Sequence, residues 1–218
     1  MEKDILLTAG IQKREAFLGL LRMLAGRVGQ VLDYSSFAND LNIDQKTVKD
    51  WVGILKTMRI IELVEPYSSN LSSRLIKSPK IYFLDTGLAV RLQGWSNSLS
   101  LLTSPQQGSL FENLVFTELH RLKLNFFPNL QIFWWRTKEG KEIDFIVSHE
   151  NSPPIFIEAK VSPRKIPALS SDREFVKVFG KNPRPLILCH QEGDRTIGEQ
   201  VPIAHLTDYL KPRFRGAR

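Results

Sequence analysis

Three carboxylates and one amine occur between residues 108 and 160 in an order that could place them around a divalent metal ion. They are Glu112, then Asp144, then Glu158 and Lys160, the last two separated by a single alanine. Carboxylate oxygens are the ligands that hard divalent cations prefer. The elements that carry these residues must therefore be able to bring four distant side chains together.

Residues 142–147 have the alternation of a half-buried β-strand. Ile143, Phe145 and Val147 are expected to point one way, while Glu142 and Asp144 point the other. The strand would thus present apolar side chains to a core and carboxylates to the opposite face.

Residues 155–161 repeat this pattern, with Glu158 and Lys160 sharing the face opposite the apolar residues. The intervening segment 149–154 is short and rich in turn residues, which predicts a hairpin. Asp144 and Glu158 would then lie close together, and such carboxylates repel unless a cation joins them. The alternative is that both strands carry ordinary solvated charges, which are common.

Residues 108–122 are predicted to form a helix with a broad apolar arc. Glu112 and Glu118 fall inside that arc, where a carboxylate is costly unless it is paired, hydrogen-bonded or bound to a metal. Of the two, Glu112 is the one that we assign to the metal site.

The order of helix Glu, strand Asp and Glu-x-Lys on the next strand resembles the PD-(D/E)xK nuclease-like core, an α-β-β-β-α-β unit. Residues 132–136 would be its first strand, 167–180 its second helix and 185–190 its fourth strand. The whole chain is similar to the C-terminal region of a large group of prokaryotic AAA+ ATPases. The matching phrases are residues 47–55, 77–88, 108–113, 142–145 and 157–160.

The resemblance implies phosphodiester hydrolysis of DNA. Asp144 and Glu158 would bind Mg²⁺ or Mn²⁺, Glu112 would complete the metal shell, and Lys160 would orient water or offset transition-state charge. The proline that often precedes the strand aspartate is replaced by Ile143. Because diverged copies of such a core can keep the fold and lose activity, the alternative is a non-catalytic DNA-binding or protein-interaction module that partners an AAA+ ATPase.

The first third of the chain predicts a helix-turn-helix followed by a wing. Apolar periodicity indicates helices from about residue 13 to 29, over 35–41, and after Asp44, a good N-cap. Residues 59–64 and 80–84 would be the two wing strands of a winged helix. The residues expected to contact DNA are Gln45, Lys46, Lys49 and Lys56 on the third helix, with Arg74, Lys77 and Lys80 on or near the wing.

Winged helices also dock proteins, and lysine-rich helix faces are often only solvated. Lysines supply sequence-independent attraction to phosphates, whereas few residues here suit base recognition. We therefore expect weakly sequence-specific DNA contact.

Composition agrees with a cytoplasmic protein, with a net charge of +7, which favours polyanionic partners. No apolar run approaches a membrane span, no secretory signal is evident, and Cys189 alone cannot form an internal disulfide.

Other chemistries have weaker support. Asp85-Thr-Gly matches the aspartic-protease signature, yet the residues after it read as a helix that Asp85 would cap. The four histidines lack zinc-ligand spacing. No Walker A loop is present, which predicts no ATP site and leaves an ATPase to act in trans or on a longer parent chain.

Two modules are predicted, a winged helix-turn-helix over residues 1–94 and an α/β nuclease-like domain over 95–218. The Ser-rich segment 94–100 would be the linker between them. The fold class is thus mixed α/β (α+β).

Overall fold

The computed structural model describes residues 13–67, 78–137, 140–150 and 153–161, with shorter stretches at 175–176, 179–180, 184–189, 195–197 and 201–205. The described residues fall into two compact units. Residues 13–63 and 78–104 form the N-terminal unit, whereas 64–67 and the described residues from 105 onward form the C-terminal unit.

The division between the units therefore falls after residue 104, not after residue 94 as the sequence predicts. The reason is local, since the segment expected to be a linker contains helix α6 (Ser98–Leu102), whose first turn is capped by the side chain of Asn97. Residues 64–67 join the C-terminal unit because the Tyr67 N–H donates to the Trp134 carbonyl at 2.7 Å.

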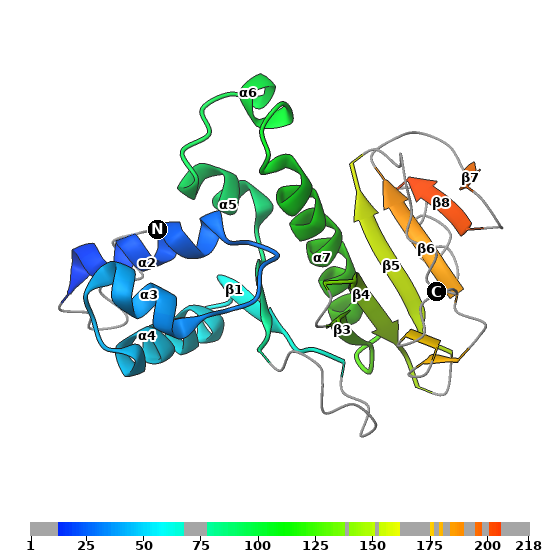
Figure 1. Cartoon of the computed structure of the whole chain (residues 1–218), viewed down its shortest axis with the longest axis horizontal. Coiled ribbons are helices and arrows are strands. Elements are labelled where there is room, and N and C mark those ends of the chain that lie inside the picture. Colours follow the sequence, from blue (N-terminus) through cyan, green and yellow to red (C-terminus); the bar gives the residue numbers. More distant parts are fainter. Residues whose placement is uncertain are drawn as a thin grey trace. The chain divides into compact units, whose positions relative to one another are not determined.

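Three helices form the start of the N-terminal unit, as predicted, and lie together in Figure 1. They are α2 (Arg14–Gly26), α3 (Tyr34–Leu41) and α4 (Gln45–Thr57). Asp33 and Asp44 cap α3 and α4 by accepting backbone N–H hydrogen bonds at their first turns. The helices bury one face each, which includes Phe17, Leu20, Leu21, Leu24, Phe37, Val48, Val52 and Leu55.

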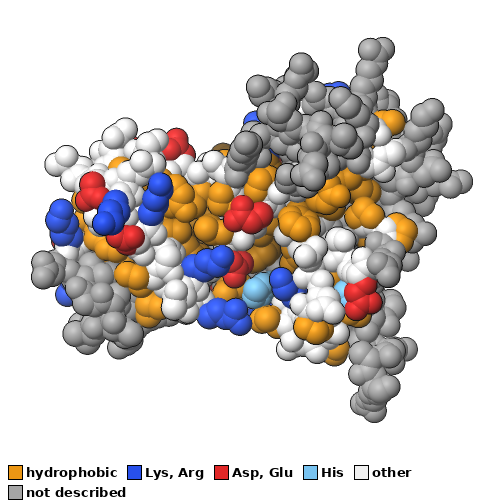
Figure 2. Space-filling view, turned by 90° about the horizontal axis from the view of Figure 1, so that it is seen from below, with side chains coloured by type: hydrophobic (Ala, Val, Ile, Leu, Met, Phe, Trp, Pro, Cys, Tyr) orange, Lys and Arg blue, Asp and Glu red, His pale blue; other side chains and the backbone are white. Residues whose placement is uncertain are grey.

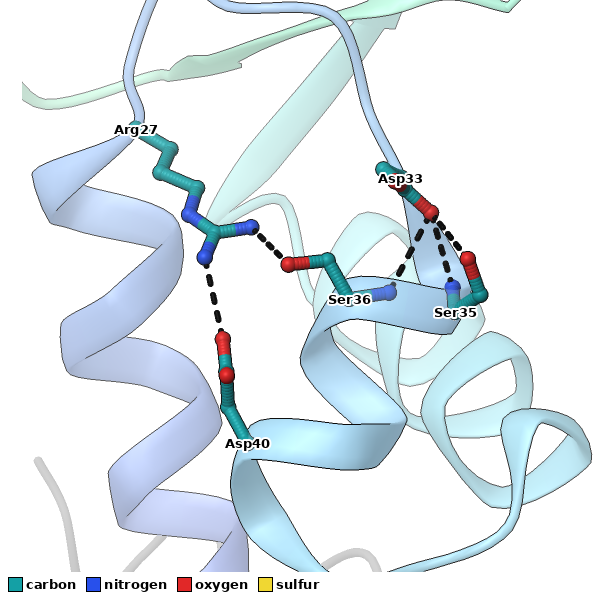
Figure 3. Close-up of polar contacts among 5 residues, drawn as sticks. All are labelled: Arg27, Asp33, Ser35, Ser36 and Asp40. Carbon is teal, nitrogen blue, oxygen red and sulfur yellow. Dashed lines mark hydrogen bonds and ion pairs between the residues drawn. The ribbon is translucent and has the colours of Figure 1, made fainter.

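Arg27, just after α2, ties this helix to α3 (Figure 3). Its guanidinium Nη1 donates to Ser36 Oγ at 2.9 Å, and its Nη2 donates to Asp40 Oδ2 at 3.0 Å. The guanidinium also lies 4.5 Å from the centre of the Phe37 ring. The planar fork of an arginine suits such simultaneous contacts, so Arg27 links the end of α2 to α3.

Two short strands follow the helices, β1 (Ile61–Val64) and β2 (Lys80–Phe83), and pair as an antiparallel sheet. Helix α5 (Thr86–Leu92) comes next. Asp85 caps it by accepting the Leu88 N–H at 2.9 Å, which confirms the expected role of this aspartate.

The C-terminal unit begins with helix α7 (Gln107–Asn125), which lies alongside the first strands of a sheet (Figure 1). The strand order is β3-β4-β5-β6-β8-β7. Strands β3, β4 and β5 are antiparallel neighbours, and β6 continues the sheet parallel to β5. The bounds are β3 (Gln131–Arg136), β4 (Glu142–Ser148), β5 (Ile155–Lys160), β6 (Arg184–Cys189), β7 (Arg195–Ile197) and β8 (Val201–His205).

The two faces of this sheet pack against different aromatic groups. On one face, Phe145 of β4 stacks on Phe116 of α7, with ring centres 6.4 Å apart. On the other, Phe156 and Trp135 pack against Phe175, with ring centres 5.1 and 5.9 Å away. Phe175 belongs to the predicted helix over 167–180, most of which lies outside the described residues.

None of the helices in the described ranges has both the length and the apolar composition to cross a bilayer.

Candidate functional site

Asp144, Glu158 and Lys160 meet at one end of the sheet. The Lys160 ammonium lies 2.9 Å from Glu158 Oε2 and 3.5 Å from Asp144 Oδ2. Asp144 Oδ2 also accepts a hydrogen bond from the Ala159 N–H at 2.8 Å. The predicted hairpin of β4 and β5 is confirmed, and it brings two carboxylates to one lysine.

Both carboxylates are buried, unlike the solvated charges that were the alternative. Asp144 is 6% exposed and Glu158 is 5% exposed. Within the part of the chain that the structure describes, Glu158 Oε1 has no hydrogen-bond partner. A buried carboxylate oxygen without a partner is costly, so it marks a place where a further ligand would stabilise the protein.

Burial and the neighbouring Asp144 carboxylate raise the pKa of Glu158 to about 8, against the opposing charge of Lys160. For Lys160, burial acts to lower the pKa of the ammonium, but the charges of Asp144 and Glu158 and its hydrogen bonds outweigh burial and raise it. The lysine therefore stays charged, whereas Glu158 takes up a proton readily.

An irregularity in β4 occurs at the aspartate. Phe133 of β3 is paired with Ile146, but the next pair along is Trp135 with Ile143. One residue of β3 therefore lies opposite two of β4, which are Asp144 and the residue after it. Such β-bulges redirect side chains and are common beside active sites.

Because of this bulge, the predicted alternation of side chains along β4 is wrong. Ile143 packs in the cluster with Ile146 and Phe156, whereas Phe145 faces α7. Ile143 and Phe145 thus do not share a face, because one extra residue in a strand reverses the side-chain parity on either side of it.

Glu112 does not join the predicted metal set. Among the described residues, no three His, Cys, Asp or Glu side chains are grouped so that they could hold a metal ion. The alternation along β5 explains this, since Ile157 pairs with Phe145 on the face that α7 covers, which places Glu158 on the other face. Glu112 lies half-buried on α7.

Glu118, the other acidic residue in the arc of α7, forms an ion pair with Arg121 one turn away. This pairing satisfies the carboxylate without a metal.

The residues that do come together fit a divalent cation. Mg²⁺ is commonly held by one or two protein carboxylates together with water and substrate phosphate, so Asp144 and Glu158 form a sufficient protein donor set. Of the oxygens of these two carboxylates, Glu158 Oε1 is the buried one without a hydrogen-bond partner among the described residues.

The predicted DNA-contact residues have different environments. Gln45, Lys46 and Lys49 are exposed on α4, and Lys49 lies 5.6 Å from the centre of the Tyr34 ring. Lys56 is also exposed but pairs with Glu62 at 3.1 Å.

Lys80 is 2% exposed, so its side chain is not placed to meet a phosphate. Its place at the start of β2, in the core of the N-terminal unit, explains why the prediction fails there. Arg74 and Lys77 lie outside the described residues. In the space-filling view, Lys and Arg side chains over the N-terminal helices are mixed with Asp and Glu side chains (Figure 2).

Two charged residues at the neighbouring strand ends, Arg136 and Glu142, were given no role from the sequence. Glu142 acts on Glu158, since its charge contributes to the raised pKa of that carboxyl. Arg136 pairs with Glu142 at 3.6 Å. Their positions in the sequence could have indicated a role, because Arg136 ends β3 and Glu142 begins β4, the strand that carries Asp144.

Two family models match the chain. One, described as a domain of unknown function (DUF8612), matches residues 1–99, and the other, also a domain of unknown function (DUF4143), matches residues 107–209. The chain thus carries two domains of unknown function, and the gap between the matches includes the division between the two units.

The chain is distantly similar to two mycobacterial proteins. Uncharacterized protein Rv2008c of Mycobacterium tuberculosis is 32% identical over 131 residues, which cover 60% of this chain and 29% of that protein. Uncharacterized protein Mb2031c of Mycobacterium bovis gives the same values. The chain therefore spans less than a third of the length of these relatives. No solved structure matches it.

Proposed function

We propose that the C-terminal unit is a metal-dependent phosphodiesterase module that acts on DNA, and that the N-terminal unit is a winged helix that contacts DNA. The observation that carries the proposal is the buried cluster of Asp144, Glu158 and Lys160, with Glu158 Oε1 unpartnered. The order of α7, three antiparallel strands and a parallel fourth strand supports a PD-(D/E)xK-like fold for this unit.

The roles of the three residues follow from their surroundings. Asp144 and Glu158 would hold Mg²⁺ or Mn²⁺, which when bound supplies a Lewis acid and a more acidic water. Asp144 is kept in place by the Ala159 N–H, and Lys160 stays charged and can stabilise a negatively charged phosphate oxygen. In the reaction, water adds to phosphorus, one P–O ester bond breaks, and the departing oxygen leaves as an alcohol.

The N-terminal unit supports DNA contact through α4. Asp44 begins the helix at a defined residue, and Gln45, Lys46 and Lys49 are exposed along it. Helix α4 follows α3 after a short turn, and the two-stranded sheet of β1 and β2 comes next, as in a winged helix. Exposed lysines give attraction to phosphates that depends little on sequence.

Plasmid nicking in Mg²⁺ or Mn²⁺ tests the phosphodiesterase. The parent is expected to nick, and Asp144→Ala and Lys160→Ala are each expected to lower the rate by about a hundredfold or more. Glu118→Gln is the matched control, because it alters a carboxylate of the same unit that is paired with Arg121. The control should cleave at the parent rate.

Activity that survives both site substitutions would indicate a contaminating nuclease. No cleavage by the parent, with DNA binding retained in a gel-shift titration, would favour the non-catalytic DNA-binding or interaction module. A binding constant that does not change with salt would argue against DNA as the partner, because counterion release requires weakening as salt rises.

A further inference from the structure

Helix α4 has a glycine, Gly53, on its exposed face. Gly53 lies in the interior of the helix, between the buried residues Val52 and Leu55 in sequence, yet is itself exposed. The Thr57 hydroxyl donates to the Gly53 carbonyl at 2.9 Å, and the helix continues through this turn. Glycine is one of the least favourable residues inside a helix, because it loses the most backbone freedom on folding. A glycine at this position therefore needs a reason.

The packing of the N-terminal unit does not supply that reason. A Cβ atom at Gly53 would meet no atom of another element within 4 Å among the described residues. Gly19 of α2 is the opposite case, since a Cβ atom there would lie 2.8 Å from Leu41 Cδ2 and disturb the packing of α2 on α3. Gly53 also keeps the negative φ of an ordinary helical residue, so alanine fits the same backbone without strain.

The charged side chains around Gly53 are suited to a polyanion. Residues four and seven positions apart lie on one face of an α-helix, so Lys49 is one turn from Gly53 and Lys46 is two turns from it. Both lysines are exposed. Asp50 borders the same face, and the charge of Lys56 at the next turn is offset by an ion pair. The face thus combines positive charge with a place where a polyanion can approach the helix backbone closely.

We propose that Gly53 is the point of closest approach between α4 and DNA, where the sugar–phosphate backbone packs against the helix backbone and Lys46 and Lys49 contact the neighbouring phosphates. This inference rests on the proposed DNA contact of the N-terminal unit and adds to it where the helix meets the duplex. A side chain at position 53 would hold the helix away from the DNA and lengthen the distances from both lysines to phosphate. The missing Cβ atom therefore favours binding at a cost in stability.

Substitution of Gly53 in the full chain tests this inference, because stability and binding should change in opposite directions. Gly53→Ala should raise the midpoint of thermal unfolding by about 3 °C, since alanine is the better helix former and its methyl group has room. Its affinity for a short DNA duplex, measured by fluorescence anisotropy in EDTA, should fall about fivefold. Gly53→Leu should lower the affinity about fiftyfold without lowering the unfolding midpoint below that of the parent.

Two further variants separate this steric effect from other causes. Gly26→Ala is the matched control, because a Cβ atom at this last residue of α2 would also meet no atom of another element within 4 Å among the described residues. It should keep the parent affinity. Gly53→Ala removes no charge, so its slope of log binding constant against log salt should equal that of the parent, whereas Lys49→Ala should lower the slope by about 1.

The possible results distinguish this inference from the proposed function. If Gly53→Ala and Gly53→Leu bind the duplex as tightly as the parent, the inference is overturned and the proposed DNA contact stands. A lower unfolding midpoint for Gly53→Ala would also overturn the inference, because the glycine would then serve the fold. If the parent does not bind the duplex, or binds it independently of salt, the proposed DNA contact fails and this inference fails with it.

Discussion

Lysines on α4 and the lysine at the end of β5 have contrasting surroundings. Lys46 and Lys49 project from an amphipathic helix into solvent, whereas Lys160 lies between two carboxylates that are almost fully buried. A solvated cation contributes little to stability and is free to meet a phosphate. A cation between buried carboxylates instead offsets the free-energy cost of burying them. Lysine therefore supports stability at position 160, whereas the lysines on α4 provide long-range attraction to phosphates.

Of the lysines on α4 and β5, Lys160 should have the largest effect on the free energy of unfolding when it is replaced. Lys160→Met leaves two carboxylates without their cation, and we expect the free energy of unfolding to fall by about 3 kcal/mol at pH 8, after allowance for the partial exposure of the lysine. Lys46→Met on α4 should change it by less than about 0.5 kcal/mol. Urea unfolding of both variants beside the parent measures this, and equal losses would remove the contrast.

The stability of the protein should also depend on pH through Glu158, whereas the exposed residues of α4 should contribute no such dependence. The pKa of Glu158 rises from 4.5 to about 8 on folding, so the folded protein holds a proton that the unfolded chain has released. Stability is therefore lost as pH rises from about 4.5 to about 8, and Glu158→Gln removes this loss. In metal-free buffer at pH 9 the variant should be more stable than the parent by on the order of 2 kcal/mol, with near equality at pH 4.

Thermal unfolding across this pH range provides the measurement. Glu118→Gln is the control, because Glu118 is paired on α7 and should show no such dependence. A Glu158→Gln variant that is less stable than the parent at pH 9 would contradict the burial of an ionised Glu158.

The polar contacts of the N-terminal unit should have an intermediate effect. Arg27→Ala removes the hydrogen bonds to Ser36 and Asp40 and the contact with the Phe37 ring, so we expect a loss of about 1 kcal/mol in the free energy of unfolding. Arg27→Lys should restore less than half of it, since a lysine cannot donate to both partners in the same geometry. Full recovery by lysine would mean that charge alone matters there.

The smallest effect on stability is expected on the exposed face of α4. Lys46→Ala and Lys49→Ala should each leave the unfolding free energy within about 0.5 kcal/mol of the parent. Each should nevertheless reduce the slope of log binding constant against log salt for duplex DNA by about 1. Gel shifts or anisotropy at several salt concentrations measure the slope. Lys56→Ala is the internal comparison and should change it less, because Lys56 is paired with Glu62.

The elements of both units were largely predictable. Apolar residues at helical spacing indicated α2 and α4. Asp44 and Asp85, as N-cap residues, indicated where α4 and α5 begin. Alternation indicated β4 and β5, and the short turn-rich segment between them indicated their antiparallel pairing. These signals are readable because caps, helix periods and hairpin turns depend on residues only a few positions apart.

The failures share one physical cause, which is contact between residues that are distant in sequence. Lys80 resembled a wing cation, but its strand packs into the core of its unit. Ile143 resembled an ordinary alternating position, but a bulge set by pairing with β3 turned it to the other face. Glu112 resembled a third metal ligand, but no group of three His, Cys, Asp or Glu side chains that could hold a metal forms among the described residues.

By itself, the sequence determined most of the helices and the strands up to β6, where several of them begin, and that Asp144 lies on the strand before the one that carries Glu158 and Lys160. Only the tertiary structure decided that both carboxylates are buried and that one lysine pairs with both. The reason is that local patterns fix backbone conformation, whereas the burial of a charge depends on which distant surfaces fold over it.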